Sequence, residues 1–218
     1  MATICDTTAD AVADINDGST VLIGGFGMAG MPVALIDALI DHGATELTVV
    51  SNNAGNGDTG LAALLAARRV RKVICSFPRQ SDSWVFDGLY RAGDIQLEVV
   101  PQGTLAERMR AAGAGIGAFY CPTAVGTPLA EGKEQRVIDG RTYILEYPLA
   151  GDVALIGAYQ SDRMGNLVYR KTARNFGPVM ATAATTTIVQ VHEVVETGAL
   201  DPEAVITPSI YVDKVVAV

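Results

Sequence analysis

Histidine is scarce in this chain, with only His42 and His192 among 218 residues. Neither lies in an HExxH pattern or beside a cysteine at metal-ligand spacing, which excludes the common zinc motifs. His42 ends an apolar helical run just before Gly43, where a cation suits a helix C-terminus. His192 alternates within a strand-like stretch and is expected to point outward. We therefore expect a structural role for both histidines and no metal site.

Cysteine and positive charge are also in short supply. Cys5, Cys75 and Cys121 are odd in number and form no CxxC pair, as is typical of a cytoplasmic chain with reduced thiols. Sixteen Lys and Arg against twenty-four Asp and Glu give a net charge of −8, which argues against nucleic acid or an anionic membrane as a partner.

Long hydrophobic runs are absent as well. No apolar stretch approaches the roughly 20 residues of a membrane-spanning helix, and the first residues have neither the basic region nor the apolar core of a signal peptide. No GxSxG segment is present, and the Gly132-Lys133 pair continues into Glu134, so no Walker A loop is present either. We expect a cytoplasmic chain that does not bind a membrane.

What the chain does have is a 49% apolar composition, which excludes intrinsic disorder, and a length that favours a single domain over residues 1–218. Strand-like and helical patterns alternate through the first half. The predicted strands are Thr20–Gly24, Glu46–Ser51, Val70–Ser76 and Ile95–Val100, and the predicted helices are Pro32–His42, Gly60–Arg68 and one opened by a Thr104-x-x-Glu107 capping box. This alternation of strands and helices predicts a three-layer α/β/α fold with a mainly parallel sheet.

The second half has a different pattern. A long loop is predicted over Pro122–Gly140, followed by consecutive strands at Arg141–Tyr147, Asp152–Tyr159 and Asn166–Tyr169, the last two joined by a turn at Arg163–Gly165. A short helix near Asn175–Ala184, a strand at Thr186–Val195 and a strand-like C-terminal segment after Pro208 complete the prediction. We expect these strands to add antiparallel pairs to the sheet.

The sharpest local feature is a glycine loop between the first predicted strand and the first predicted helix. Four glycines in seven residues allow close approach of the backbone to a ligand, and amides at a helix N-terminus favour negative charge. A plain tight turn is the alternative, but it needs fewer glycines. The candidate anion-binding residues are Gly24, Gly25, Phe26, Gly27, Met28, Ala29 and Gly30.

Gly25 to Gly30 also satisfies the spacing G-x-G-x-x-G of dinucleotide-binding loops. That fingerprint requires an acidic residue at the end of the next strand, about 20 residues on. Here the next strand ends in Ser51-Asn52-Asn53. We therefore do not expect the chain to bind NAD.

The whole segment Asp17–Pro32 resembles, without a gap, the signature of coenzyme A-transferases: acid or Asn, Gly, two variable residues, three apolar residues, Gly-Gly-Phe, three variable residues, Gly-x-Pro. The resemblance continues through Ser51–Gly55, Pro101–Arg108, Gly113–Thr123, Asp162–Phe176 and Ile206–Val216. The chain is similar to the A (alpha) subunits of two-subunit 3-oxoacid-type enzymes, and its stretch from Ser51 to Gly93 most resembles those that act on 3-oxoadipate in aromatic catabolism (the beta-ketoadipate pathway).

The resemblance implies transfer of coenzyme A from succinyl-CoA to a carboxylic acid through a glutamyl-CoA thioester. The family's nucleophilic glutamate lies in a segment of the B (beta) subunit that has no counterpart here, so the implied partner is a B subunit in a heterodimer or heterotetramer. No permanently bound cofactor is implied, because the coenzyme A thioester is a substrate. The family's pattern also implies that Asn52, Asn53 and Gln102 line the shared active site.

The residues themselves agree with that placement. Asn52, Asn53 and Gln102 follow the carboxyl ends of predicted strands, where open α/β sheets bind ligands. Their amides can donate hydrogen bonds to a carboxylate or an oxyanion without adding a titrating group. For Asn52 and Asn53, ordinary turn formation is the alternative.

A second carboxylate on the substrate would need a cation, and Arg79 is the candidate, followed by Arg91. Simple solvation of an exposed arginine is the alternative. The cluster Arg68, Arg69, Arg71 and Lys72 fits a charged helix end and strand start better than a phosphate site.

Three alternatives to the 3-oxoadipate interpretation stay open at this point. The first is the A (alpha) subunit of an acetoacetate enzyme of the same family. The second is a phosphosugar isomerase with the same sheet topology, and the third is a non-catalytic regulatory subunit.

Overall fold

A computed structural model describes residues 1–218. Its main element is an eight-stranded sheet in the order β1-β14-β12-β9-β2-β3-β4-β5, and every neighbouring pair is parallel. The strands are β1 (Thr3–Cys5), β2 (Thr20–Ile23), β3 (Leu47–Asn53), β4 (Val70–Phe77), β5 (Gln96–Val99), β9 (Gly151–Gly157), β12 (Ala184–Val191) and β14 (Lys214–Ala217).

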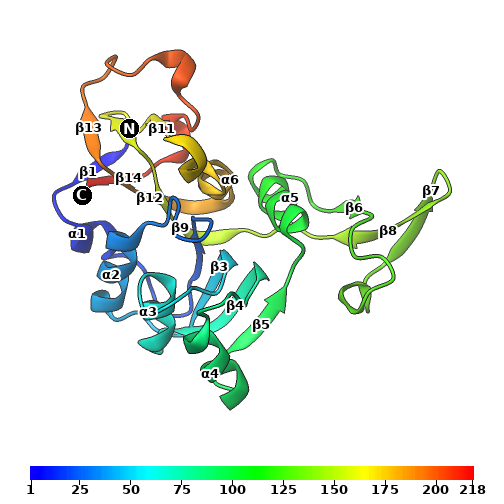
Figure 1. The fold of residues 1–218 in the computed structure, drawn as a ribbon. Helices are drawn as coiled ribbons and strands as arrows, with labels where there is room; N and C mark the ends of the chain where they lie inside the picture. Colours follow the sequence, from blue (N-terminus) through cyan, green and yellow to red (C-terminus); the bar gives the residue numbers. More distant parts are fainter.

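Helices cover both faces of this sheet (Figure 1). They are α1 (Thr8–Val12), α2 (Val33–His42), α3 (Leu61–Ala66), α4 (Trp84–Ala92), α5 (Gln102–Gly113) and α6 (Gly177–Ala183). Successive residues of a strand point to opposite faces, so Val21 and Ile23 pack with α1–α4 while Leu22 packs with α5 and α6. The two resulting hydrophobic clusters confirm the three-layer α/β/α prediction. No helix is long and apolar enough to cross a membrane.

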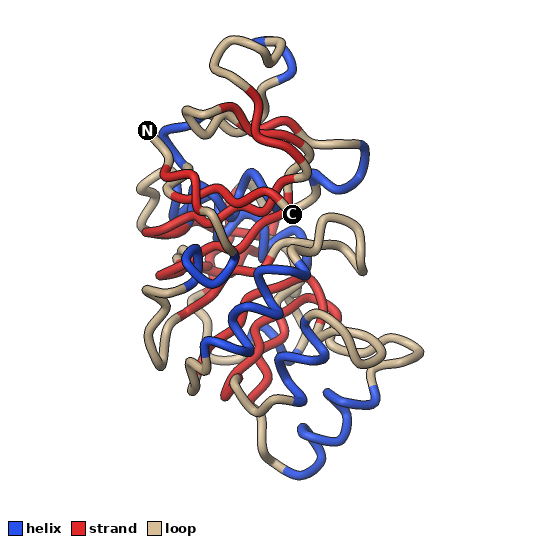
Figure 2. Tube along the Cα trace, turned by 90° about the vertical axis from the view of Figure 1, so that its left-hand side faces the viewer, coloured by secondary structure: helices blue, strands red, loops and turns tan.

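Two small sheets add the antiparallel pairs that the sequence predicted. One contains β6 (Phe119–Cys121), β7 (Gln135–Ile138) and β8 (Arg141–Glu146), all antiparallel, and it projects from the body as an arm (Figure 1). The other contains β10 (Gln160–Asp162), β11 (Leu167–Val168) and β13 (Glu193–Val195). The loop that carries the short 3₁₀ helix Pro202–Ala204 stands out at the top of both views (Figures 1 and 2).

Several predicted boundaries are wrong for local reasons. The capping box is absent, because Pro101 already opens α5 and Thr104 lies buried inside the helix, 3.8 Å from the Cys121 sulfur. The predicted loop Pro122–Gly140 contains a 3₁₀ turn (Pro128–Ala130) and β7. The predicted strand Thr186–Val195 breaks at His192, so β12 and β13 belong to different sheets.

The second half departs furthest from the sequence prediction. The three predicted strands are present as β8, β9 and β11, but they belong to three different sheets. The strand that pairs with β11 across the predicted turn is β10 and not β9. The C-terminal strand is confined to β14, after a 3₁₀ turn at Ser209–Tyr211. The sequence analysis also missed β1, α1 and α4. The predicted helix Asn175–Ala184 is shorter, because Asn175 is used in a loop contact described below.

The order of the strands determines where a ligand can bind. The chain runs from β2 outward through β3, β4 and β5 in one direction, whereas β9, β12, β14 and β1 lie on the other side of β2. The connections that follow β2 and β9 therefore leave toward opposite sides, and such a switch point opens a crevice at the carboxyl ends of the strands. The glycine loop after β2 lies at this crevice.

Candidate functional site

The glycine loop is held by its own backbone and by one asparagine. Phe26 and Ala29 exchange backbone hydrogen bonds of 3.0 and 3.3 Å, which makes the loop a tight reversal. The Asn175 side chain accepts from the Gly25 amide at 3.1 Å and donates to the Ala29 carbonyl at 2.9 Å. The same asparagine Nδ2 also lies within hydrogen-bonding distance of the carbonyls of Thr172 and Ala173. Asn175 thus joins the glycine loop to the loop before α6.

Two of the glycines have clear structural reasons. Gly25 has φ +129° and Gly30 has φ +72°, both in the left-handed region. A Cβ on Gly30 would lie 2.3 Å from the Ala173 carbonyl oxygen. The plain-turn interpretation therefore accounts for part of the glycine content.

The rest of the loop remains open to a ligand. The backbone amides of Gly27, Met28 and Gly30 make no hydrogen bond inside the chain, while those of Gly24, Gly25, Phe26 and Ala29 are used. Phe26 and Met28 are each more than half exposed. Binding of an anion by Gly24–Gly30 stays a prediction, and the structure restricts the available donors to three amides.

A polar cluster lies one and two strands away, at the carboxyl ends of β3 and β4. Asn52 Oδ1 accepts hydrogen bonds from Gln102 Nε2 at 2.7 Å and from Ser76 Oγ at 2.9 Å. The structure thus brings Asn52 and Gln102 together, although 50 residues separate them in the sequence. The Asn52 Nδ2 group makes no hydrogen bond within the chain and can act as a donor toward a ligand.

Asn53 is less available. Its Oδ1 accepts the Gly55 amide at 2.9 Å, which is the local turn that the sequence left open as an alternative. Asn52 and Asn53 are also the last two residues of β3 and are buried, whereas the sequence placed them in a loop.

Arg79 lies beyond the end of β4 and is not a free cation. Its guanidinium makes two hydrogen bonds to Asp87, at 2.6 and 2.7 Å, and the Arg79 side chain is 57% exposed. The hydrogen bond to Asp87 raises the pKa of Arg79 and lowers that of Asp87. The second candidate, Arg91, lies 3.8 Å from the same carboxylate. The role of Arg79 in substrate binding stays a prediction.

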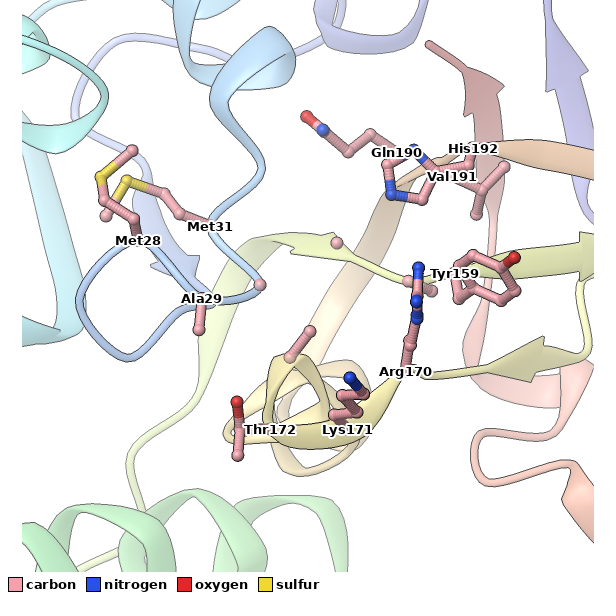
Figure 3. A pocket seen from close by; sticks show the side chains of 14 residues that line it. Met28, Ala29, Met31, Tyr159, Arg170, Lys171, Thr172, Gln190, Val191 and His192 are labelled. Atoms are coloured by element: carbon pink, nitrogen blue, oxygen red, sulfur yellow. The ribbon is translucent and has the colours of Figure 1, made fainter.

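A cavity of about 450 Å³ opens beside the glycine loop, at the carboxyl ends of β2, β9 and β12 (Figure 3). Met28 and Met31 line one side, and Tyr159, Gln190 and His192 line the other. Arg170 and Lys171 come from the loop after β11 and direct their side chains into the space between (Figure 3). No Asp or Glu lines the cavity.

Sequence reasoning missed the residues of that loop. Arg170, Lys171 and Arg174 form an R-K-x-x-R pattern in a chain of net charge −8, and this local excess of positive charge is the signal that points to them. His192 is exposed, as the sequence predicts, but it lies at the bend between β12 and β13 and not within a strand. It follows the last residue of β12 and lies edge-on to Tyr159, with ring centroids 5.8 Å apart, at the cavity wall. His42, by contrast, ends α2 as predicted, with its Nε2 3.2 Å from the Ala13 carbonyl.

Neither a reactive thiol nor a cluster of metal ligands lies at this site. Cys75 is fully buried in β4, and burial raises the pKa of its thiol to about 12. No group of three or more His, Cys, Asp and Glu side chains gathers closely enough to hold a metal ion. The polar side chains that line the cavity and the Asn52–Gln102 cluster are therefore amides, hydroxyls, an imidazole and cations.

Comparison with known proteins places this site in a family context. Residues 5–218 match the family model described as "Coenzyme A transferase". The chain is 68% identical to the A (alpha) chain of the 3-oxoadipate CoA-transferase of Pseudomonas putida, over 98% of this chain and 92% of that protein. It is 62% identical to the protein of the same name from Acinetobacter baylyi, over 97% and 93%.

More distant relatives carry a related name. The chain is 48% identical to the A (alpha) chain of the probable succinyl-CoA:3-ketoacid coenzyme A transferase of Bacillus subtilis, over 99% of this chain and 90% of that protein. Among solved structures, glutaconate coenzyme A-transferase from Acidaminococcus fermentans superposes with a TM-score of 0.86 at 21% identity, over 99% of this chain and 75% of that one. At that identity the likeness supports the fold alone.

Proposed function

The chain belongs to the coenzyme A transferase family, and from this premise we propose that it is the A (alpha) subunit of an enzyme that transfers coenzyme A from succinyl-CoA to 3-oxoadipate. The observation that carries the proposal is the 68% and 62% identity to two proteins named for that activity, over nearly the whole of each chain. The products are 3-oxoadipyl-CoA and succinate, and the coenzyme A thioester acts as a substrate rather than as a resident cofactor.

The chemistry at the site supports a shared active centre. Asn52 and Gln102 supply amides but no nucleophile, and no carboxylate lines the cavities beside the glycine loop. The nucleophilic glutamate is therefore assigned to a B subunit that docks at this edge of the sheet. Its carboxylate oxygen attacks the thioester carbonyl carbon, the C–S bond breaks and a mixed anhydride forms. Coenzyme A thiolate then attacks the glutamyl carbonyl and succinate leaves.

Residues of this chain act on the charge that develops in these steps. The free Nδ2 of Asn52 is placed to donate a hydrogen bond to the carbonyl oxygen as it becomes an oxyanion, and Gln102 orients Asn52 through its 2.7 Å contact. The amides of Gly27, Met28 and Gly30 make no internal hydrogen bond and are available to the coenzyme A portion of the donor. None of these donors titrates in the neutral range.

The relative named for 3-ketoacids, at 48% identity, supports an alternative acceptor, acetoacetate. The family match favours group transfer over the phosphosugar isomerase alternative. We place the reaction in the cytoplasm, in aromatic compound catabolism, which fits three unpaired cysteines.

The test is reconstitution. The chain is co-expressed with its B subunit and assayed with succinyl-CoA plus 3-oxoadipate or acetoacetate, and the stalled intermediate is located by mass spectrometry. We expect no transfer by this chain alone, higher kcat/KM for 3-oxoadipate, and a glutamyl-CoA adduct on the partner. An adduct on this chain, or full activity without the partner, would contradict the proposal.

A further inference from the structure

Most cations of this protein already have a carboxylate partner. Ten of the sixteen Lys and Arg side chains form ion pairs. Of the six that do not, three lie within five residues of one another: Arg170, Lys171 and Arg174. In a chain with net charge −8, unpaired positive charge is thus concentrated on one loop.

These cations line two of three neighbouring hollows at the glycine loop. Lys171 and Arg174 line one hollow together with Phe26 and Asn175. Phe26 and Asn175 also line the next hollow, which contains Gln102. Phe26 and Asn175 therefore stand between the Lys171–Arg174 cations in one hollow and Gln102 in the other. Asn52 joins the second group through its 2.7 Å contact with Gln102.

The electrostatics of these hollows favour an anion at Lys171 and Arg174. No Asp or Glu lines any of the three hollows, so nothing in the chain competes for Lys171 and Arg174. Arg170 is partly engaged, since its guanidinium lies 5.7 Å from the centre of the Tyr159 ring. Lys171 is held at φ +53°, a left-handed conformation that is uncommon outside glycine and that recurs at functional sites.

We propose that Lys171 and Arg174 bind the second carboxylate of the dicarboxylic acyl group while its reacting carboxylate lies at Asn52 and Gln102. This inference rests on the proposed function and goes beyond it by assigning the specificity for a dicarboxylic acid to these two residues. A guanidinium and an ammonium together give a carboxylate both a planar two-point contact and a point charge. Arg79 is a weaker candidate, because its charge is already paired with Asp87, which accepts two of its hydrogen bonds.

The experiment compares two acceptors of the same length. The enzyme reconstituted with its B subunit is assayed with 3-oxoadipate and with 3-oxohexanoate, which has a methyl group in place of the second carboxylate. In a two-step covalent transfer, kcat/KM for the acceptor reports only the step in which the enzyme–coenzyme A thioester meets that acceptor. The variants are Lys171→Gln/Arg174→Gln, Arg79→Gln and, as a charge-matched control, Arg71→Gln, an exposed unpaired cation at the opposite end of β4.

We expect the double variant to lose about 10- to 100-fold in kcat/KM for 3-oxoadipate, the size of one or two charged hydrogen bonds, with less than about threefold change for 3-oxohexanoate. Arg71→Gln leaves both values unchanged. Equal losses for the two acceptors would overturn the proposal and assign the cations to the coenzyme A portion. Unchanged values in the double variant, or a selective loss confined to Arg79→Gln, would overturn it as well.

Failure of the proposed function has a different signature. It appears in the parent enzyme, as transfer to monocarboxylic acids only. In that case the role of Lys171 and Arg174 is tested with the coenzyme A donor instead. The parent and the double variant are compared in kcat/KM for succinyl-CoA and for butyryl-CoA. A loss confined to succinyl-CoA supports the role of the two cations, and equal losses for both donors, or no loss, overturn it. Should the double variant fail to assemble, Arg174→Lys and Arg174→Gln alone give the same comparison.

Discussion

Asn175 shows how a single side chain can position a loop that it does not belong to. Its two polar atoms contact the glycine loop at the Gly25 amide and the Ala29 carbonyl, 150 and 146 residues away in the sequence. A side-chain amide accepts at its oxygen and donates at its nitrogen at any pH, which suits an asparagine to this pair of contacts. Sequence reasoning could place Asn175 near a helix start but not against the glycine loop, because that contact depends on the tertiary fold.

We predict that Asn175→Asp destabilises the chain by about 2–3 kcal/mol, because the new carboxylate oxygen faces carbonyl oxygens that need a donor. The glycine loop then shifts, and kcat of the reconstituted enzyme falls at least about tenfold. Urea unfolding and steady-state kinetics measure the two effects. The control is Asn16→Ala, an exposed asparagine whose side chain makes one local contact, with an expected change within about 0.5 kcal/mol. If Asn175→Asp has the stability and turnover of the parent, the contacts of Asn175 with the glycine loop are dispensable.

At the scale of elements, the glycine loop and the loop before α6 act as one unit. Gly30 touches the second loop so closely that a Cβ would lie 2.3 Å from Ala173 O, whereas a Cβ on Gly27 would meet nothing within 4 Å. Both glycines have positive φ, +72° and +60°. The two positions therefore separate backbone strain from loop packing.

We predict that Gly27→Ala costs about 1–2 kcal/mol, the strain of a left-handed alanine, and leaves turnover within about threefold of the parent. Gly30→Ala carries the same strain and in addition forces the loops apart, so it costs about 1–3 kcal/mol more and lowers kcat at least about tenfold. Denaturant titrations and kinetics of the pair provide the comparison. Equal behaviour of the two variants would mean that the contact at Ala173 does not hold the loop.

The elements also show what local sequence can and cannot predict. The strands β2 to β5 and the helix α2 follow from short apolar runs, a proline at the start and a glycine at the end, all of which are local signals. The central position of β9 between β2 and β12 has no such signal, since it depends on a chain crossover after the arm. The proximity of Asn52 and Gln102 could be predicted, because the parallel strands β3 and β5 end at the same edge of the sheet. The cavity at β9 and β12 was missed because the positions of these strands were unknown.

At the scale of the whole molecule, both faces of the main sheet are covered, whereas the carboxyl edge exposes apolar side chains. Hydrophobic clusters of 29 and 19 buried residues lie on the two faces of the sheet, so the chain has a core of its own on each face. At the carboxyl edge, Phe26, Phe77 and Trp84 are 54%, 59% and 63% exposed. Large apolar side chains exposed beside a polar site are typical of a surface that binds another protein.

Trp84 is the only tryptophan of the chain and reports on this edge. If the B subunit docks here to deliver its glutamate, the Trp84 indole leaves water and its fluorescence emission shifts to shorter wavelength. The partner's own tryptophans are removed from the measurement by subtracting the spectrum of the complex made with Trp84→Phe, since that variant changes only this indole. A shift in the difference spectrum, saturating at the subunit ratio at which transfer activity saturates, is the expected result. An unchanged Trp84 spectrum in a fully active complex would mean that α4 stays exposed. Because both subunits must still meet at Asn52 and Gln102, the partner would then approach from the arm or from the β9–β12 side.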